Sequence, residues 1–399
     1  MRSLCLLQSH ISKNSEFSPK GFMSEIQIIP VTDSKTKKEF INFPYELYKN
    51  ASNWIAPLKM ERKEFLSPKK NPYFQSADVQ FFIAKRDGQV VGRISAQVNR
   101  EHNKRYNEKT GHFGLFECVN DSEVARALFQ QAEQWLRLRG MNKIVGPYSL
   151  SINEESGLLI EGFNSAPYPF MPHNFSYYEN LISTLGFSKV KDLIAWNYDI
   201  TKPIPEVAQQ IADAVREYPN LTIREVDQKN IRRDVRIISD VFNSAWSKNW
   251  GFLPWSDAEI EKMAKDFKMI LNPRLALIAE VNGVPAAISI AIPNYHEAIA
   301  DLKGSLFPFG LFKLIYRLKT NKVKSARLCL LGIKKEFRND VLAGLSVCLY
   351  AEMHKRAKMI GMTHGELSWT LDDNEKINNG IALMGGEPYK KFRIFEKAL

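Results

Sequence analysis

The sequence predicts an α/β protein with mixed sheets, built from two halves that repeat the same order of elements. Short apolar strand patterns alternate with helical patterns along the chain, which is typical of sheets covered by helices. Two turns, Asp87-Gly88 and Asn282-Gly283, each join a pair of apolar runs and favour β-hairpins. Similar elements surround both hairpins, so the repeat lies in element order and not in identical residues.

The first half is expected to place its hairpin between a helical region and a further strand and helix. The predicted elements are a strand at 25–31, a helix at 34–50, hairpin strands at 79–84 and 90–98, a strand at 111–119, a helix at 122–138, a strand from 144, a helix at 177–185 and a strand at 190–198. Ser122 is a candidate N-cap for the longest of these helices, and Gly140 follows its end.

The second half repeats this order after an amphipathic linker helix. The predicted elements are a strand at 221–226, helices at 231–246 and 257–271, hairpin strands at 275–281 and 285–292, a strand at 326–332, a helix at 341–359, a strand at 365–371, a helix at 376–384 and a strand at 391–396. Ser256 is the candidate N-cap of the second helix. At roughly 100–200 residues per domain, we expect a disordered extension at 1–22, domains at 23–200 and 221–399, and a linker at 201–220.

The composition excludes several classes of protein. The chain has 399 residues, 44% hydrophobic and 25% charged, which is globular and not disordered. The apolar run 275–292 contains Glu280 and a turn, so it indicates a hairpin and not a membrane span. The cysteines are far apart, which indicates reduced thiols in a cytoplasmic protein and no metal site; they are Cys5, Cys118, Cys329 and Cys348.

The net charge of +11 at pH 7 favours an anionic partner such as a phosphorylated cofactor or a membrane surface. The sequence lacks a zinc finger, a KH loop and an RNP motif, so no nucleic acid is expected.

Three passages carry a resemblance to a known family. They are residues 87–92, residues 174–187 and the stretch Leu331-Gly332-Ile333-Lys334-Lys335-Glu336-Phe337-Arg338. They resemble the hairpin, the last helix and the cofactor-binding turn of GNAT N-acetyltransferases. The resemblance covers nearly all of residues 25–397 and implies two tandem GNAT-like domains. It also implies an acetyl-CoA or acyl-CoA substrate and no metal.

The resemblance implies a site for the acyl-CoA in the second half. Strand carbonyls near Leu331 and Ile333 would pair with pantetheine amides, and a helix N-terminus would bind the diphosphate. The basic and polar residues expected at the phosphates are Lys334, Lys335, Arg338 and Asn339, and Asn374 is a further candidate contact or a helix N-cap. The turn departs from the family pattern because Val341 and Ala343 replace glycines. The first half is acidic at 117–123, so we expect it to lack the cofactor.

A closer resemblance is to bacterial tandem GNAT-like proteins, some of which are similar to bacterial ceramide synthases. It rests on residues 146–155, 157–163, 306–310 and 384–386. It implies acylation of an amine, which is a small molecule or a lipid such as a sphingoid amine. Such a reaction needs a base and an acid, and Glu366 and Tyr389 are the candidates. The acidic pair Asp372-Asp373 could bind a cationic amine or form a solvated turn.

Two further segments have both a functional and an ordinary interpretation. Residues 302–338 contain ten Lys or Arg among Phe and Leu, and 302–325 could contact a membrane surface, such as the inner membrane, or pack on the sheet. The cluster Asn153-Glu154-Glu155 could face a cleft between the halves or lie in an exposed loop.

The sequence therefore favours an acyl-CoA-dependent N-acyltransferase. A non-catalytic ligand-binding or membrane-associated module with a degenerate GNAT fold is the main alternative. An enzyme that uses aminoacyl-tRNA is a third interpretation, which fits the tandem order and the basic charge.

Overall fold

The computed structural model describes residues 25–320, 322–338, 342 and 344–399. The extension predicted at 1–22 lies outside the described residues, as do Asn339, Val341 and Ala343 of the predicted cofactor turn. The strands are β1 (Gln27–Pro30), β2 (Ala77–Arg86), β3 (Gln89–Asn99), β4 (Thr110–Cys118), β5 (Lys143–Gly146), β6 (Leu158–Glu161), β7 (Ser188–Asp199), β8 (Leu221–Glu225), β9 (Ala276–Val281), β10 (Val284–Pro293), β11 (Ser325–Ile333), β12 (His364–Leu371) and β13 (Glu387–Ala398).

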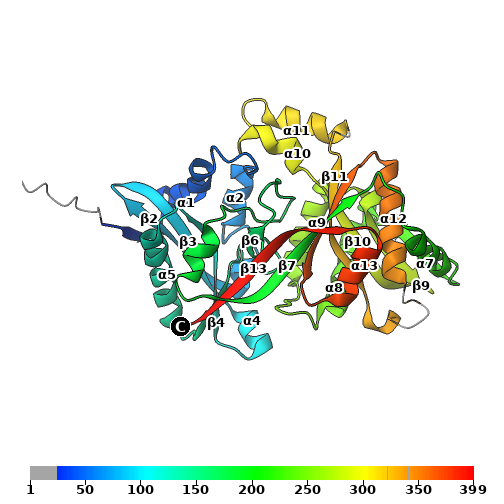
Figure 1. Cartoon of the computed structure of the whole chain (residues 1–399), viewed down its shortest axis with the longest axis horizontal. Helices are drawn as coiled ribbons and strands as arrows, with labels where there is room; N and C mark the ends of the chain where they lie inside the picture. The colour runs from blue at the N-terminus through cyan, green and yellow to red at the C-terminus, as the bar shows by residue number, and fades with distance from the viewer. Residues whose placement is uncertain (1–24, 321, 339–341, 343) are drawn as a thin grey trace, which may run out of the picture.

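The helices cover both faces of the sheet that these strands form (Figure 1). They are α1 (Ser34–Leu47), α2 (Lys59–Phe65), α3 (Tyr73–Ser76), α4 (Arg100–Tyr106), α5 (Ser122–Arg137), α6 (Tyr178–Ser183), α7 (Glu206–Arg216), α8 (Ile231–Trp246), α9 (Asp257–Ile270), α10 (His296–Ile299), α11 (Gly310–Lys319), α12 (Leu345–Met359) and α13 (Glu375–Leu383). The mixed α/β architecture predicted from the sequence is therefore confirmed.

The described strands form one mixed sheet that runs through both halves. Its order is β1-β2-β3-β4-β5-β13-β7-β12-β11-β10-β9-β8, and β6 also pairs with β13. The last strand of the chain, β13, thus lies between β5 and β7 of the first half. Strand β7 in turn pairs with β12 of the second half. Figure 1 shows β13 and β7 side by side across the middle of the molecule.

Side chains along each strand of the second half alternate between the two faces of the sheet, which explains why helices cover both faces. In β9, Ile278 packs in one apolar cluster with α8 and α9, whereas Ala279 packs in another with α7 and α12. Successive side chains of a strand point to opposite faces, so this hairpin has helices on both sides. In the first half, α5 places Val124, Leu128 and Leu136 against the sheet, and all three are fully buried.

Several local predictions are confirmed. Asp87, Gly88, Asn282 and Gly283 have positive φ angles of 51°, 76°, 52° and 75°, as hairpin turns of this type require. Ser256 caps α9 in a capping box with Glu259.

The N-cap predicted for α5 was wrong by one residue. Asp121 and not Ser122 caps this helix, because its carboxylate accepts hydrogen bonds from the backbone N–H groups of Glu123 and Val124. The short elements β6, α4 and α10 were not predicted, since each has too few residues for a clear period.

Replacing Phe392 of β13 should destabilise the molecule strongly. This side chain is fully buried among apolar residues of both halves, so Phe392→Ala should lower the free energy of unfolding by about 3–5 kcal/mol. Urea unfolding measured by circular dichroism checks this. The control Phe307→Ala, at a side chain that is 88% exposed, should change little; equal effects of both substitutions would contradict the assigned core.

Candidate active site

A groove lies where strands β11 and β12 stop pairing. Their parallel register ends at Leu328 and Leu367. Beyond this point β11 pairs with β10 as far as Ile333, and β12 pairs with β7 as far as Leu371. The groove between them is lined by Trp246, Asn249, Leu328, Cys329, Leu331, Tyr350, Leu367, Ser368, Trp369, Thr370, Leu371, Asn374, Ile377 and Ile381.

The groove joins a larger cavity between the two halves, with a volume of about 270 Å³. Five residues line both the groove and the cavity, namely Trp246, Asn249, Cys329, Ser368 and Trp369. The first half supplies residues 65, 71–73, 150–154 and 170 to the cavity, and the second half supplies residues of α8, α9, the loop between them, and the strands β10, β11 and β12. A ligand in the groove and a second ligand in the cavity can therefore contact each other beside these shared residues.

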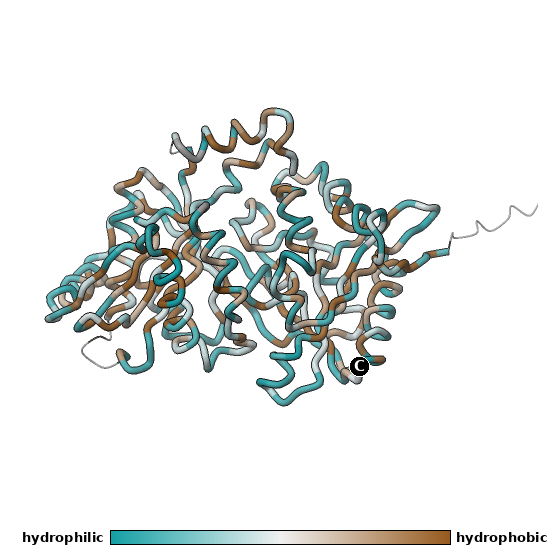
Figure 2. Tube along the Cα trace, turned by 180° about the vertical axis from the view of Figure 1, so that it is seen from behind, coloured by the Kyte–Doolittle hydropathy of each residue, from teal (hydrophilic) through white to brown (hydrophobic). Residues whose placement is uncertain are grey.

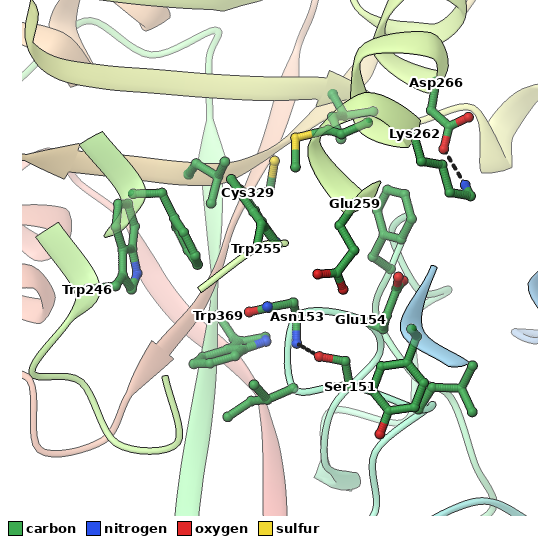
Figure 3. Close-up of a pocket in the computed structure, with 18 of the residues that line it drawn as sticks. Ser151, Asn153, Glu154, Trp246, Trp255, Glu259, Lys262, Asp266, Cys329 and Trp369 are labelled. Atoms are coloured by element: carbon green, nitrogen blue, oxygen red, sulfur yellow. Dashed lines mark hydrogen bonds and ion pairs between the residues drawn. The ribbon is translucent and has the colours of Figure 1, made fainter. Parts of the chain in front are cut away.

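Aromatic side chains dominate the lining of the cavity. They are Phe65, Tyr73, Phe170, Phe242, Trp246, Trp250, Phe252, Trp255, Phe267 and Trp369. Figure 3 shows the indole rings of Trp246 and Trp369 on one side of the cavity and the carboxylates of Glu154 and Glu259 on the other. The cavity thus offers a large apolar surface and an acidic region, which suits a ligand with a hydrocarbon part and a polar or cationic group.

A glycine permits one of these tryptophans to lie against the groove. At Gly332 of β11, an added Cβ would come within 2.2 Å of the Trp246 ring. Trp246 is the last residue of α8, so any side chain at position 332 would displace the end of this helix. Sequence reasoning did not identify Trp246, Trp250 and Trp255 as site residues, although three tryptophans within ten positions were a usable signal.

The predicted phosphate-binding residues follow β11 in a short turn, Lys335–Phe337. The Lys334 ammonium forms an ion pair with Asp240, and only 12% of the Lys334 side chain is exposed. Lys335 is exposed, and its side chain makes no hydrogen bond or ion pair with the described residues. The Arg338 guanidinium donates hydrogen bonds of 2.9 Å to the carbonyls of Ile333 and Ala245. Arg338 thus occupies the Ile333 carbonyl that was expected to be free.

The helix that follows this turn has an N-terminus without a side-chain cap from its own N-cap residue. That residue is Gly344, which has no side chain. The helix in the same position of the first half, α5, differs because the Asp121 carboxylate fills its N-terminus and also pairs with Arg86 at 2.7 Å. Helix N-termini attract anions through free N–H groups and the helix dipole. An anionic ligand is therefore favoured at α12 and disfavoured at α5.

Asn374 lines the groove from the N-cap position of α13. Its side chain makes no capping hydrogen bond there, while its backbone N–H bonds to the Leu371 carbonyl at 3.1 Å. Asn374 therefore does not cap α13 with its side chain, which was the alternative interpretation of this residue. The amide group is available to a ligand in the groove.

The predicted acid and base, Tyr389 and Glu366, contact each other. The Tyr389 hydroxyl donates a short hydrogen bond to Glu366 Oε2, and the Ser368 hydroxyl donates one of 2.6 Å to Glu366 Oε1. Burial and the neighbouring Glu366 carboxylate hold the pKa of Tyr389 well above its ordinary value, so its phenol stays protonated. Arg327 completes this network: its Nε donates to Ser368 Oγ at 2.7 Å and lies 3.8 Å from Glu366 Oε1.

Glu366 does not itself line the groove or the cavity, whereas Ser368 lines both. The Ser368 hydroxyl is therefore the connection between the buried carboxylate and any reacting group. Sequence reasoning missed Arg327, because only the pairing of β11 with β12 brings it beside Glu366. It also missed Ser368, although the i, i+2 spacing from Glu366 on one strand was a usable signal.

The other acidic candidates differ in their surroundings. Asp372 and Asp373 are exposed and form ion pairs with Lys189 at 3.3 Å and Lys191 at 2.7 Å. These contacts agree with the interpretation of this pair as a solvated turn. Glu154 and Asn153, in contrast, line the cavity between the halves. The prediction that this cluster could face a cleft is therefore confirmed for these two residues.

The acidic stretch 117–123 of the first half is part of the fold. Glu117 is half-buried, and its carboxylate accepts hydrogen bonds from Tyr48 at 2.6 Å and Tyr178 at 2.8 Å, with Arg93 at 3.6 Å. Burial raises the pKa of Glu117. These contacts give Glu117 a structural role.

An apolar segment lies outside both halves of the sheet. Six of the eleven exposed large apolar side chains among the described residues fall within 307–316: Phe307, Phe309, Leu311, Phe312, Ile315 and Tyr316. Figure 2 shows brown stretches in the protruding segment that Figure 1 labels α11. The other five exposed apolar side chains are scattered, so this concentration is particular to the α11 segment.

Within the described part of the chain, no helix has the length and apolar character needed to cross a membrane. No group of three or more His, Cys, Asp or Glu side chains in the same residues is placed to hold a metal ion.

Comparison with known proteins identifies close relatives in sequence. Protein YghO of Escherichia coli (strain K12) is 41% identical over 369 residues, which cover 91% of this chain and 93% of YghO. Bacterial ceramide synthase of Caulobacter vibrioides (strain NA1000 / CB15N) is 40% identical over 379 residues, which cover 94% of this chain and 98% of that protein. No model of a protein family matches the chain.

Solved structures show the same fold. A tandem GNAT protein from the clavulanic acid biosynthesis pathway matches with a TM-score of 0.56 at 12% identity, covering 94% of this chain and 98% of that one. A GCN5-related glucosamine N-acetyltransferase region of a fungal multi-domain GH3 beta-N-acetylglucosaminidase matches with a TM-score of 0.57 at 11% identity, covering 94% and 38%. The tandem GNAT fold predicted by resemblance is confirmed.

Proposed function

Because this chain belongs to the family that includes protein YghO and bacterial ceramide synthase, we propose that it is an acyl-CoA-dependent N-acyltransferase acting on a lipid amine. The observation that carries this proposal is the groove between β11 and β12, which opens into an aromatic cavity. The acyl donor occupies the groove and the acceptor occupies the cavity. A sphingoid amine has the required long chain and amino group.

The donor's phosphates lie near Lys335 and the N-terminus of α12. Lys335 is exposed and without a partner among the described residues, and α12 has glycine as its N-cap. The open edge of β11 at Leu331 supplies backbone groups for the pantetheine, and Asn374 supplies its side-chain amide. Lys334 and Arg338 support the turn through their own contacts.

The reaction moves three protons. The ammonium form of the amine must lose one proton to become nucleophilic. Its nitrogen then bonds to the acyl carbon and loses a second proton, the carbon–sulfur bond breaks, and the departing sulfur takes one proton, so that one proton is released overall. The Ser368 hydroxyl, which lines both groove and cavity, carries protons between the reacting groups and Glu366, which acts as the base. Tyr389 hydrogen-bonds to the other oxygen of Glu366, so as the acid it supplies its proton by way of that carboxyl group.

The α11 segment brings the protein to the membrane that holds its acceptor. Exposed Phe307, Phe309 and Phe312 can insert among acyl chains, and exposed lysines lie beside them. These lysines are Lys303, Lys313, Lys322 and Lys324. The occupant of this surface is therefore a bilayer that contains anionic lipids.

Incubation with palmitoyl-CoA and a long-chain amine tests the proposed reaction. Mass spectrometry should detect the amide, with one free thiol released for each amide formed. Absence of amide together with absence of CoA binding at millimolar concentration would instead favour the non-catalytic module. Transfer from aminoacyl-tRNA would establish the third interpretation.

Glu366→Gln should reduce turnover while leaving donor binding intact. The amide keeps the size of the side chain but cannot accept a proton, so kcat should fall about 100-fold or more. Steady-state kinetics and calorimetric binding of palmitoyl-CoA measure the two effects separately. Glu161→Gln, at an exposed glutamate, is the control, and a wild-type rate for Glu366→Gln would remove Glu366 from the mechanism.

Lys335→Ala combined with Arg338→Ala should weaken CoA binding about tenfold, because a charge-assisted contact and its supporting turn are both lost. Isothermal calorimetry with CoA checks this. The control Lys229→Ala with Arg232→Ala removes the same charge from two exposed positions outside the proposed site, and it should leave the affinity for CoA unchanged. If both double variants bind equally, the phosphates lie elsewhere.

Replacing Phe307, Phe309 and Phe312 by serine should reduce vesicle binding at least about tenfold, since each buried phenylalanine contributes about 1.5–3 kcal/mol. Co-sedimentation with phosphatidylglycerol-containing vesicles measures it, and binding should weaken in high salt. Leu138→Ser with Met359→Ser, at two other exposed apolar positions, is the matched control. Retained binding by the triple variant would place any membrane contact outside α11.

A further inference from the structure

The cavity contains three acidic side chains whose surroundings differ. The Glu259 carboxylate accepts hydrogen bonds from the Ser256 N–H at 2.8 Å and the Ser256 hydroxyl at 2.7 Å, so it serves as a helix cap. Asp266 forms an ion pair with Lys262 one turn along the same helix. The Glu154 carboxylate makes no hydrogen bond or ion pair with any residue that the structure describes. Of the three, Glu154 has the carboxylate that is free to receive a ligand.

Local contacts hold Glu154 at this position. Its backbone N–H bonds to the Ser151 carbonyl at 3.1 Å, and the side-chain amide of its neighbour Asn153 bonds to the Leu253 carbonyl of the second half at 3.1 Å. The next residue, Glu155, pairs with Arg62 at 3.1 Å and with Ser149 at 3.1 Å. Glu155 is thus neutralised by its own partners, while Glu154 faces the cavity (Figure 3).

We propose that Glu154, a residue of the first half, binds the ammonium group of the acceptor and selects amines over alcohols of the same length. This inference rests on the proposed function, since it assigns the acceptor to the cavity. Primary alkyl amines are cations at neutral pH, whereas alcohols are uncharged. A half-buried carboxylate that lines a cavity gains more from a cation than from a neutral hydroxyl, because the opposite charges attract each other more strongly there than in bulk water.

The electrostatic surroundings of Glu154 agree with this role. Burial is the main cause that raises the pKa of Glu154 to about 8, and the like charges of Glu155 and Glu259 raise it further, while Arg62 and Lys262 lower it. An ammonium group would stabilise the charged carboxylate. Below pH 8, binding of the cation should therefore release about one proton, because the carboxyl must ionise as the complex forms.

Binding of two simple probes to the full chain without any acyl donor tests the proposal. Dodecylamine and dodecanol have the same chain length and differ in charge, and the cavity tryptophans give a fluorescence signal. The wild type should bind dodecylamine about tenfold or more tightly than dodecanol. Glu154→Gln should lose this preference and keep its affinity for dodecanol. Glu161→Gln, at an exposed glutamate that is not among the residues lining the cavity, should behave as the wild type.

The pH dependence supplies a second readout that a merely structural role would not produce. Between pH 6 and pH 9 the wild-type affinity for dodecylamine should rise as Glu154 ionises, whereas that of Glu154→Gln should stay flat. Calorimetry in buffers of different ionisation enthalpy should detect proton release with the wild type alone. Glu154→Asp should restore part of the amine preference.

The outcomes separate this inference from the proposed function. An amine preference that persists in Glu154→Gln, or failure of dodecylamine to bind, would overturn the assignment of Glu154 even if acyl transfer occurs. A preference that depends on Glu154 in a protein that forms no amide would support the amine site and overturn the acyltransferase proposal alone.

Discussion

The end of hydrogen bonding between β11 and β12 is the constraint on which the site depends. Parallel neighbours in a sheet ordinarily continue side by side, and backbone groups left unpaired inside a protein are costly. Here each strand keeps a partner on its other edge, β10 for β11 and β7 for β12. The separation therefore leaves only the inner edges open, which is the arrangement an extended ligand with amide groups can complete.

The exchange of strands between the halves supports this opening. Strand β12 could leave β11 only because β7, from the first half, pairs with it beyond Leu367 at Thr370 and Leu371. Strand β13 fixes β7 on its other side and also pairs with β5. The groove thus belongs to the second half in sequence, but the strand that holds it open comes from the first half.

The features predicted best from sequence are those set by nearby residues. Helix α8 was predicted at its observed bounds, and both hairpin turns and the Ser256 cap are decided within a few positions. The position of β13 was not predicted, because its alternating apolar residues fit any buried strand and do not specify a partner some 200 residues away. The same limit applies to Arg327, which meets Glu366 and Ser368 only through pairing between distant strands. The two acidic clusters show how ambiguous a local pattern can be: Asp372 and Asp373 form ion pairs with lysines of β7, whereas the Glu154 carboxylate forms none with the residues that the structure describes.

The two halves use one structural position for opposite purposes. In the first half the helix after the fourth strand is closed by Asp121, and the preceding Glu117 is held by two tyrosines and Arg93. In the second half the corresponding helix begins at a glycine after a basic turn. A carboxylate at a helix N-terminus stabilises the helix but repels an anionic ligand. A glycine there contributes no side-chain cap and leaves the N–H groups open to an anion. The α5 N-terminus therefore disfavours an anion in the first half, whose loop at 151–154 forms a wall of the cavity between the halves.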